Sequence, residues 1–248
     1  MEFIVLGRVE MIHQGRSISL SKSKVGQMLS LLLARVNETV STDVLIDELW
    51  TGDVPQSVQT TLQTYVYHAR KLITQELGHP HAHRVLVTRP PGYAIETAER
   101  DVDANVFELL VKEGTARLKE GDAEATAARL SEALALRRGP AFSGMRIGPM
   151  LEVHATYLNE LRLTAVELRI EAFRQLGYHR ELVPELRSLV AENPLNERFH
   201  GLLIQALHEC GRRAEALQAY QRLWQVLDRE LGVRPTLEIQ KLHGSVLA

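Results

Sequence analysis

The stretch PQSVQTTLQTYVYHARKL, residues 55–72, decides how the first part of the chain is interpreted. Its apolar residues recur every three or four positions, which predicts an amphipathic helix with one buried face. The opposite face combines short hydrogen-bonding side chains with two cations: Thr60, Thr61, Gln63, Thr64, Tyr67, His68, Arg70 and Lys71. No acid occurs from Pro55 to Gln75. This composition differs from an ordinary charged, solvated helix face and indicates a binding surface.

The local charge around this helix favours a polyanionic partner. The 248-residue chain has a formal net charge of −2, but residues 55–92 hold four cations against one acid, before four histidines are counted. Charges beyond about 8–10 Å are screened at physiological salt, so a local patch matters more than the average over the chain.

The neighbouring residues predict a small sheet, three helices and a hairpin. Short strands are expected first, at residues 3–9, 10–13 and 17–20. Helices are expected after residues 21–23 and after residues 41–43, and a third has Pro55 in its first turn and stops near Gly78. The segment HRVLVTRPPGYAI, residues 83–95, has alternating apolar and polar residues, then a turn at PPG, then a second short strand, and it predicts a β-hairpin. This order predicts a winged helix, whose last helix enters the DNA major groove.

A winged helix suggests which side chains contact DNA. Thr, Gln, Tyr and His side chains on the third helix reach base edges or phosphates, and Arg70 and Lys71 pair with phosphate or guanine. The polar residues could instead be plain surface, and the two cations a solvated helix end. Lys22 and Lys24 open the first helix and face either the DNA backbone or solvent. Arg89, at the hairpin tip, is a candidate for the minor groove or its phosphates.

The second half of the chain is predicted to be almost entirely helical. The expected helices lie at about residues 105–120, 122–138, 150–176, 179–192, 195–210, 212–231 and 235–246. Gly177 and Gly211 are separated by 34 residues, the period of a tetratricopeptide repeat. Stacked helix pairs of this kind leave a concave binding surface. The fold class is therefore mainly α with a small β component, a winged helix-turn-helix followed by an all-α tetratricopeptide-like repeat domain.

These features together resemble the Streptomyces antibiotic regulatory protein (SARP) family. Leu49-Trp50 at the end of the second helix, TLQTYVYHARKL in the third and the PPGY wing resemble the OmpR-type winged helix. The closing segment LDRELGVRPTLEIQKLH, residues 227–243, resembles the end of the bacterial transcriptional activation domain. The resemblance implies a DNA-binding domain at residues 1–97, a linker at 98–104 and an activation domain at 105–248.

The resemblance also implies a function and its partners. A SARP-type activator binds direct repeats in double-stranded DNA near the −35 region, with two protomers side by side. It recruits RNA polymerase through its sigma factor and switches on a secondary-metabolite (antibiotic) gene cluster. Thr51, Gly52 and Asp53 correspond to a loop that touches RNA polymerase in OmpR-type proteins. The expected location is the cytoplasm, at the nucleoid.

Other classes of function receive little support from the residues. The phosphate-binding, dinucleotide-binding, zinc-protease and nucleophile-elbow motifs are missing, so no enzyme and no cofactor are expected. His79, His81 and His83 alternate, but a zinc site needs further Cys or carboxylate ligands, so a solvated turn and no metal are expected. The alternative function is a helical-repeat scaffold or ligand sensor whose winged helix binds protein.

Membrane and secretory segments are not expected either. No apolar run approaches the roughly 20 residues that cross a bilayer. The N-terminal residues lack the pattern of a secretory signal. Cys210 is the single cysteine, which excludes an intramolecular disulfide and suits a reducing cytoplasm.

Overall fold

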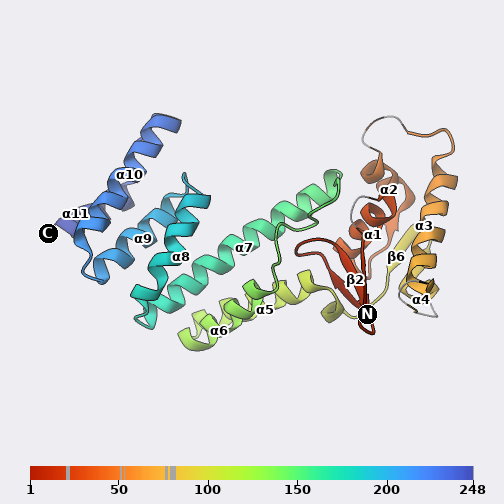
Figure 1. The fold of residues 1–248 in the computed structure, drawn as a ribbon, viewed down its shortest axis with the longest axis horizontal. Helices are drawn as coiled ribbons and strands as arrows, with labels where there is room; N and C mark the ends of the chain where they lie inside the picture. The colour runs from red at the N-terminus through yellow and green to blue at the C-terminus, as the bar shows by residue number, and fades with distance from the viewer. Residues whose placement is uncertain (21–22, 51, 53, 76–77, 79–81, 248) are drawn as a thin grey trace. The chain divides into compact units, whose positions relative to one another are not determined.

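The computed structural model describes the chain except residues 21–22, 51, 53, 76–77, 79–81 and 248 (Figure 1). Its contacts divide the chain into two compact units. The first contains residues 1–119 and 128–168, and the second contains residues 120–127 and 169–248. Within the described residues, no helix combines the length and the apolar character that crossing a membrane requires.

The first unit begins with a three-stranded antiparallel sheet in the order β1-β2-β3. The strands are β1 (Glu2–Ile4), β2 (Glu10–His13) and β3 (Arg16–Ser19). The first strand was expected to run over residues 3–9, and this length is wrong. It stops at Ile4 because the next two backbone N–H groups, of Val5 and Leu6, donate to the Asp103 carboxylate at 2.8 and 3.0 Å.

Three helices follow, and serine side chains cap two of them. The helices are α1 (Lys24–Ala34), α2 (Thr42–Leu49) and α3 (Val58–Gln75). The Ser23 hydroxyl accepts a hydrogen bond from Gly26 N at 2.9 Å, and the Ser41 hydroxyl accepts one from Val44 N at 3.4 Å. These hydroxyls satisfy N–H groups that have no partner inside the helix. Both helix starts agree with the sequence-based prediction.

The third helix begins later than its sequence indicates. Pro55 was expected in its first turn, but α3 starts at Val58. The Pro55 carbonyl accepts a hydrogen bond from Val58 N at 3.1 Å, which closes a separate turn before the helix. The expected position of Pro55 is therefore wrong by about one helical turn.

The predicted hairpin is present and belongs to a second sheet. β5 (Leu86–Arg89) and β6 (Gly92–Ile95) are antiparallel, and β4 (Val40–Ser41) pairs with β6. The sequence did not predict β4, because two residues carry no periodic signal. It did not predict α4 (Ala82–Val85) either, because a single helical turn shows no repeat beyond its two buried residues, Ala82 and Val85. A Cβ at Gly92 would lie 1.8 Å from the Val40 carbonyl oxygen, so glycine is required for β4 to approach β6.

The helices after the second sheet share the hydrophobic core of the winged helix. The short 3-10 helix η1 (Glu99–Asp101) leads into α5 (Asp103–Lys119), α6 (Ala123–Ala135) and α7 (Pro149–Gln175). One continuous cluster of buried side chains extends from Phe3 in β1 to Ala165 in α7. The first part of α7 is therefore built into the first unit, and its last residues belong to the second.

Two buried carboxylates connect these helices to the winged helix. Glu48, which is fully buried in α2, accepts hydrogen bonds from Gly148 N at 2.6 Å, Met150 N at 2.8 Å and Leu151 N at 3.4 Å. Its carboxylate thus caps the N-terminus of α7, where the helix dipole favours negative charge. Asp103, at the start of α5, binds the backbone after β1. Burial raises the pKa of the Asp103 carboxyl, and these N–H groups act in the opposite direction.

The second unit consists mainly of packed helical hairpins. Its helices are α8 (His179–Glu192), α9 (Glu197–Glu209), α10 (Arg213–Leu231) and α11 (Leu237–Leu247). α8, α9 and α10 lie side by side in Figure 1. Gly177 and Gly211 adopt the left-handed backbone (φ +79° and +72°) between consecutive helices. Each predicted start and end of a helix in the second half lies within three residues of the observed position. The predicted fold class is confirmed.

Replacement of Glu48 by glutamine should destabilise the first unit. The amide keeps the shape of the side chain but removes acceptor sites from N–H groups at the start of α7. A hydrogen bond to a charged group contributes about 1.5–3 kcal/mol, so the free energy of unfolding should fall by about 2–3 kcal/mol. Urea denaturation measures this change.

Glu38→Gln is the matched control. Glu38 forms an exposed ion pair with Arg35 at 2.9 Å, and surface pairs contribute only about 0–1 kcal/mol. Equal losses for the two variants would show that the Glu48 carboxylate does not hold α7.

Candidate nucleic-acid interface

The two faces of α3 differ sharply in burial. Leu62, Val66, Ala69 and Ile73 are at most 3% exposed and pack into the core of the first unit. The opposite face carries exposed residues from the predicted set: Thr60, Gln63, Thr64, Tyr67, His68 and Lys71. Tyr67 is 62% exposed, although a tyrosine ring has much apolar surface to bury. The sequence-predicted face is therefore assembled on one side of the helix.

Several groups on this face are free to bind a partner. The side chains of Gln63 and Lys71 make no hydrogen bond or ion pair with any described residue. The rings of Tyr67 and His68 meet edge to face, with centroids 5.6 Å apart. The threonine hydroxyls are turned toward the helix backbone. Thr64 Oγ1 donates to Thr60 O at 2.9 Å, and half-buried Thr61 donates to Ser57 O at 3.1 Å.

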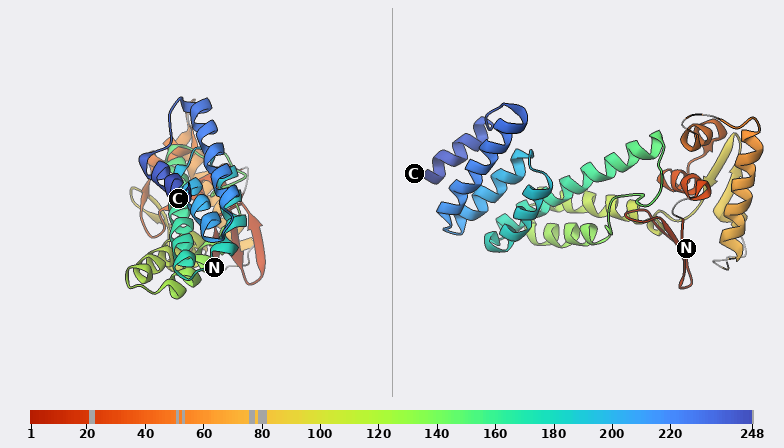
Figure 2. Two further views of the ribbon diagram at one scale, coloured as in Figure 1. Left: turned by 90° about the vertical axis from the view of Figure 1, so that its left-hand side faces the viewer. Right: turned by 45° about the horizontal axis from the view of Figure 1, so that its top comes forward.

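Arg70 is used inside the fold and holds the hairpin against α3. Its Nε and Nη2 donate to the Leu86 carbonyl at 3.0 and 2.8 Å, and Nη2 also donates to Thr88 Oγ1 at 3.0 Å. Figure 2 shows α3 alongside the hairpin strands. The DNA contact by Arg70 stays a prediction, and this geometry favours a role for Arg70 in positioning the wing.

Two further predicted cations also have partners within the chain. Arg89 pairs with Glu96 across the hairpin and donates to the Asn37 carbonyl at 3.4 Å. Lys24 donates to the Leu49 carbonyl, and its Nζ lies 5.8 Å from the centre of the Trp50 ring. Of the predicted cations that the structure describes, Lys71 alone is exposed without an intramolecular partner.

The loop after α2 is only partly described. Thr51 and Asp53, proposed as polymerase contacts, lie outside the described residues, as do Lys22, His79 and His81. Gly52 is described and exposed. Just before it, Trp50 stacks on Tyr65, with centroids 5.9 Å apart and ring planes 12° apart. Trp50 is partly buried and packs against the core of the first unit.

One cation near the start of α1 was not predicted from the sequence. Arg146, on the segment that leads into α7, lines a cavity of about 300 Å³ together with Lys24, Trp50 and Gly52. The pKa of Lys24 is lowered first by burial and then by the charge of Arg146. Because 122 residues separate the two cations, no local pattern in the sequence could have placed them together.

Comparison with known proteins identifies both halves of the chain. Residues 15–95 match the family described as transcriptional regulatory protein, C terminal, and residues 102–247 match the bacterial transcriptional activator domain. Regulatory protein DnrI of Streptomyces peucetius is 36% identical over all of this chain and 92% of its own length. Transcriptional regulator RedD of Streptomyces coelicolor is 33% identical over all of this chain and 71% of its own length.

A solved structure has the same fold over nearly the whole chain. Mycobacterium tuberculosis EmbR, in complex with a low affinity phosphopeptide, superposes with a TM-score of 0.91 at 29% sequence identity. The match covers 99% of this chain but 64% of the EmbR chain, so EmbR is the longer protein.

The fold and the matched families define a DNA-binding transcriptional activator with an OmpR-type winged helix. The chain belongs to the Streptomyces antibiotic regulatory protein family, as its sequence indicated. The names of the family and of these relatives are those of transcriptional regulators and not of enzymes.

Substitution of Lys71 should separate DNA binding from folding. If Lys71→Ala removes one phosphate contact, the slope of log affinity against log salt should fall by about 1. The free energy of unfolding should change by less than about 0.5 kcal/mol, because the side chain is exposed and unpaired. Fluorescence anisotropy across a salt series and urea denaturation measure the two effects.

Arg70→Ala should behave differently from Lys71→Ala. Loss of its hydrogen bonds to Leu86 and Thr88 should destabilise the fold by about 1–3 kcal/mol and weaken DNA binding through a loosened wing. Arg70→Lys should not restore stability, because an ammonium group lacks the planar fork of a guanidinium. An Arg70→Ala variant as stable as the wild type would exclude the positioning role.

Proposed function

We propose that the exposed face of α3 reads bases in the major groove of a promoter while the hairpin contacts the flanking backbone. The acid-free, exposed face of α3 is the observation that carries this proposal. Gln63, Tyr67 and His68 offer the donors and acceptors that base edges require, and Lys71 offers a charge for phosphate. Arg70 and Arg89 hold the hairpin in place beside this face.

The proposed operator is a pair of direct repeats near the −35 region. Two protomers bind them head to tail on one face of the duplex, so the repeats are spaced by a whole number of helical turns. This arrangement is taken from the SARP family, and the exposed surface of α3 is compatible with it. One protomer supplies one recognition helix, so an operator with two repeats takes two chains.

Activation is proposed to occur by recruitment of RNA polymerase through its sigma factor. The loop of residues 51–53 and the helical repeats of the second unit are the candidate contact surfaces. About 1.4 kcal/mol of favourable contact raises polymerase occupancy roughly tenfold when occupancy is low. The proposed target is an antibiotic gene cluster, by analogy with the family, and the proposed site of action is the nucleoid.

Selection of duplexes from a random DNA library at physiological salt tests the base-reading claim. We expect enrichment of a short direct repeat at a fixed helical spacing. Gln63→Glu should abolish enrichment, because an acid on this face is repelled by phosphates and cannot donate to adenine as glutamine does. Gln221→Glu is the matched control, since Gln221 is exposed on α10 in the second unit.

A folded wild-type protein that enriches no sequence would contradict the proposal and favour a winged helix that binds protein. Enrichment by Gln63→Glu equal to that of the wild type would instead show that α3 is not the reading element.

Transcription reconstituted with the full chain tests the recruitment claim separately. The selected repeat, placed at the −35 region, should raise transcript yield. A shift by half a helical turn, about 5 base pairs, should abolish activation and leave binding intact, because the polymerase-facing surface is rotated away. If activation were the same on both sides of the DNA helix, direct contact with polymerase would be contradicted.

A further inference from the structure

A cavity of about 280 Å³ lies within the second unit, between α8, α9 and α10. Its apolar lining includes Val190 from α8, Leu203 and Leu207 from α9, and Ala219 from α10. Leu203 and Leu207 are 6% and 1% exposed, so they belong to the hydrophobic interior of the unit. Small-molecule sites have volumes of roughly 300–1,000 Å³, which places this cavity at the size of a single-ring compound.

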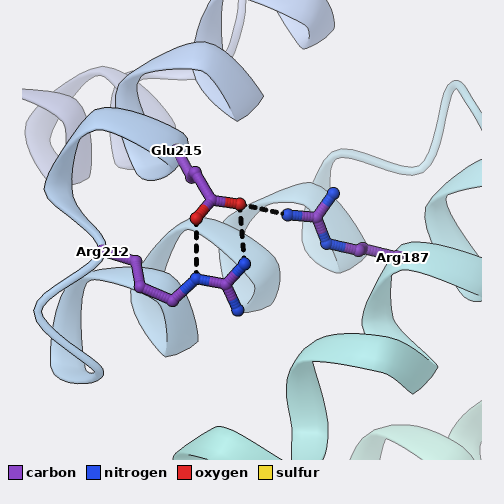
Figure 3. Close-up of polar contacts among 3 residues, drawn as sticks. All are labelled: Arg187, Arg212 and Glu215. Carbon is purple, nitrogen blue, oxygen red and sulfur yellow. Dashed lines mark hydrogen bonds and ion pairs between the residues drawn. The ribbon is translucent and has the colours of Figure 1, made fainter.

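Positive charge exceeds negative charge at the polar side of the cavity. Glu215 accepts hydrogen bonds from Arg212 Nε and Nη2, both at 2.7 Å, and from Arg187 Nη2 at 2.5 Å (Figure 3). These bonds, above all those from Arg212, hold the pKa of the Glu215 carboxyl below its usual range. One carboxylate thus serves two guanidinium groups.

A second guanidinium of the cavity lining is free. The Arg222 side chain, one turn beyond Gln218 on α10, makes no hydrogen bond or ion pair with any described residue. Arg187 binds Glu215 through Nη2 only, so its other N–H groups remain available. Among the charged residues that line the cavity, two cations, Arg187 and Arg222, therefore face one acid, Glu215, and an anion placed in the cavity would restore the balance of charge.

His200 contributes a buried polar atom without a partner. Its Nε2 lies 3.1 Å from the Pro194 carbonyl oxygen, which can only accept, so Nε2 carries the proton. Burial lowers the pKa of His200, which favours the neutral ring. Nδ1 is then an acceptor, and it is buried without a hydrogen bond to any described residue. Such unpaired atoms are rare in folded proteins, and this one belongs to a residue of the cavity lining.

We propose that this cavity binds a small organic anion, a carboxylate on an apolar single-ring body. Arg222 and the free N–H groups of Arg187 bind the carboxylate, in the planar geometry that guanidinium groups favour. Leu203 and Leu207 pack against the ring, and His200 also lines the cavity. Such a ligand would connect α8, α9 and α10 and stabilise the second unit by mass action. The activator would thereby respond to a metabolite, independently of how it reads DNA.

Methyl NMR of the full chain, titrated with para-hydroxybenzoate, tests this inference. Benzoate and octanoate extend the series to other carboxylates, and para-hydroxybenzamide is the neutral isostere. We expect saturable shifts of the Leu203 and Leu207 methyl signals with para-hydroxybenzoate. The benzamide should bind at least tenfold more weakly, because it lacks the charge that Arg222 and Arg187 recognise.

Variants of two arginines on α10 provide the matched comparison. Arg222→Gln should weaken para-hydroxybenzoate binding at least tenfold. Arg229→Gln, an exposed arginine of the same helix outside the cavity lining, should leave binding unchanged. The inference would be overturned by any of three results: no saturable shift with any of the three acids at millimolar concentration, equal affinity for the benzamide, or equal affinity of the Arg222→Gln variant.

Discussion

The Glu48 carboxylate is buried at the end of α2 and binds three backbone N–H groups at the start of α7, about 100 residues later in the chain. A buried carboxylate is costly unless its hydrogen bonds are satisfied. The start of α7 supplies those bonds, and a Cβ at Gly148 would lie 2.4 Å from the Glu48 carbonyl oxygen, so the approach also needs glycine. Asp103 makes a comparable connection between α5 and the backbone after β1. Together they explain why the core of the winged helix continues into α7.

This arrangement gives α3 a firm support. α3 contributes four side chains to the continuous core, and Arg70 connects its far end to the hairpin. The cations near α3 therefore have different tasks. Arg70 and Arg89 make contacts that shape the wing, whereas Lys71 is exposed and unpaired within the described residues. Because this packing holds the backbone of α3, the helix itself needs no ordering on binding, which favours specific binding.

Much of this architecture could be predicted from sequence, for identifiable reasons. The periodicity of α3, the serine caps of α1 and α2, and the glycines before α8 and α10 are local signals, and each corresponds to an observed element. The wrong predictions occur where contacts with residues far away in the sequence determine the secondary structure. β1 ends early because Asp103 binds the following backbone, and β4 exists only because β6 lies beside it. Likewise, no local pattern distinguishes Arg70, bound to the hairpin, from Lys71, which is free. Pairing with residues elsewhere in the chain decides that difference.

Native-state hydrogen exchange of the full chain measures most directly whether the winged helix and the start of α7 are one cooperative body. We predict that the amides of Met150 and Leu151, bound to Glu48, open with the same free energy as the protected amides of α1 and α2. The amides of Val5 and Leu6, bound to Asp103, should open with them. If the amides of Met150 and Leu151 opened at a much lower free energy than the amides of α2, a single cooperative body would be excluded. The start of α7 would then be only loosely associated with the winged helix.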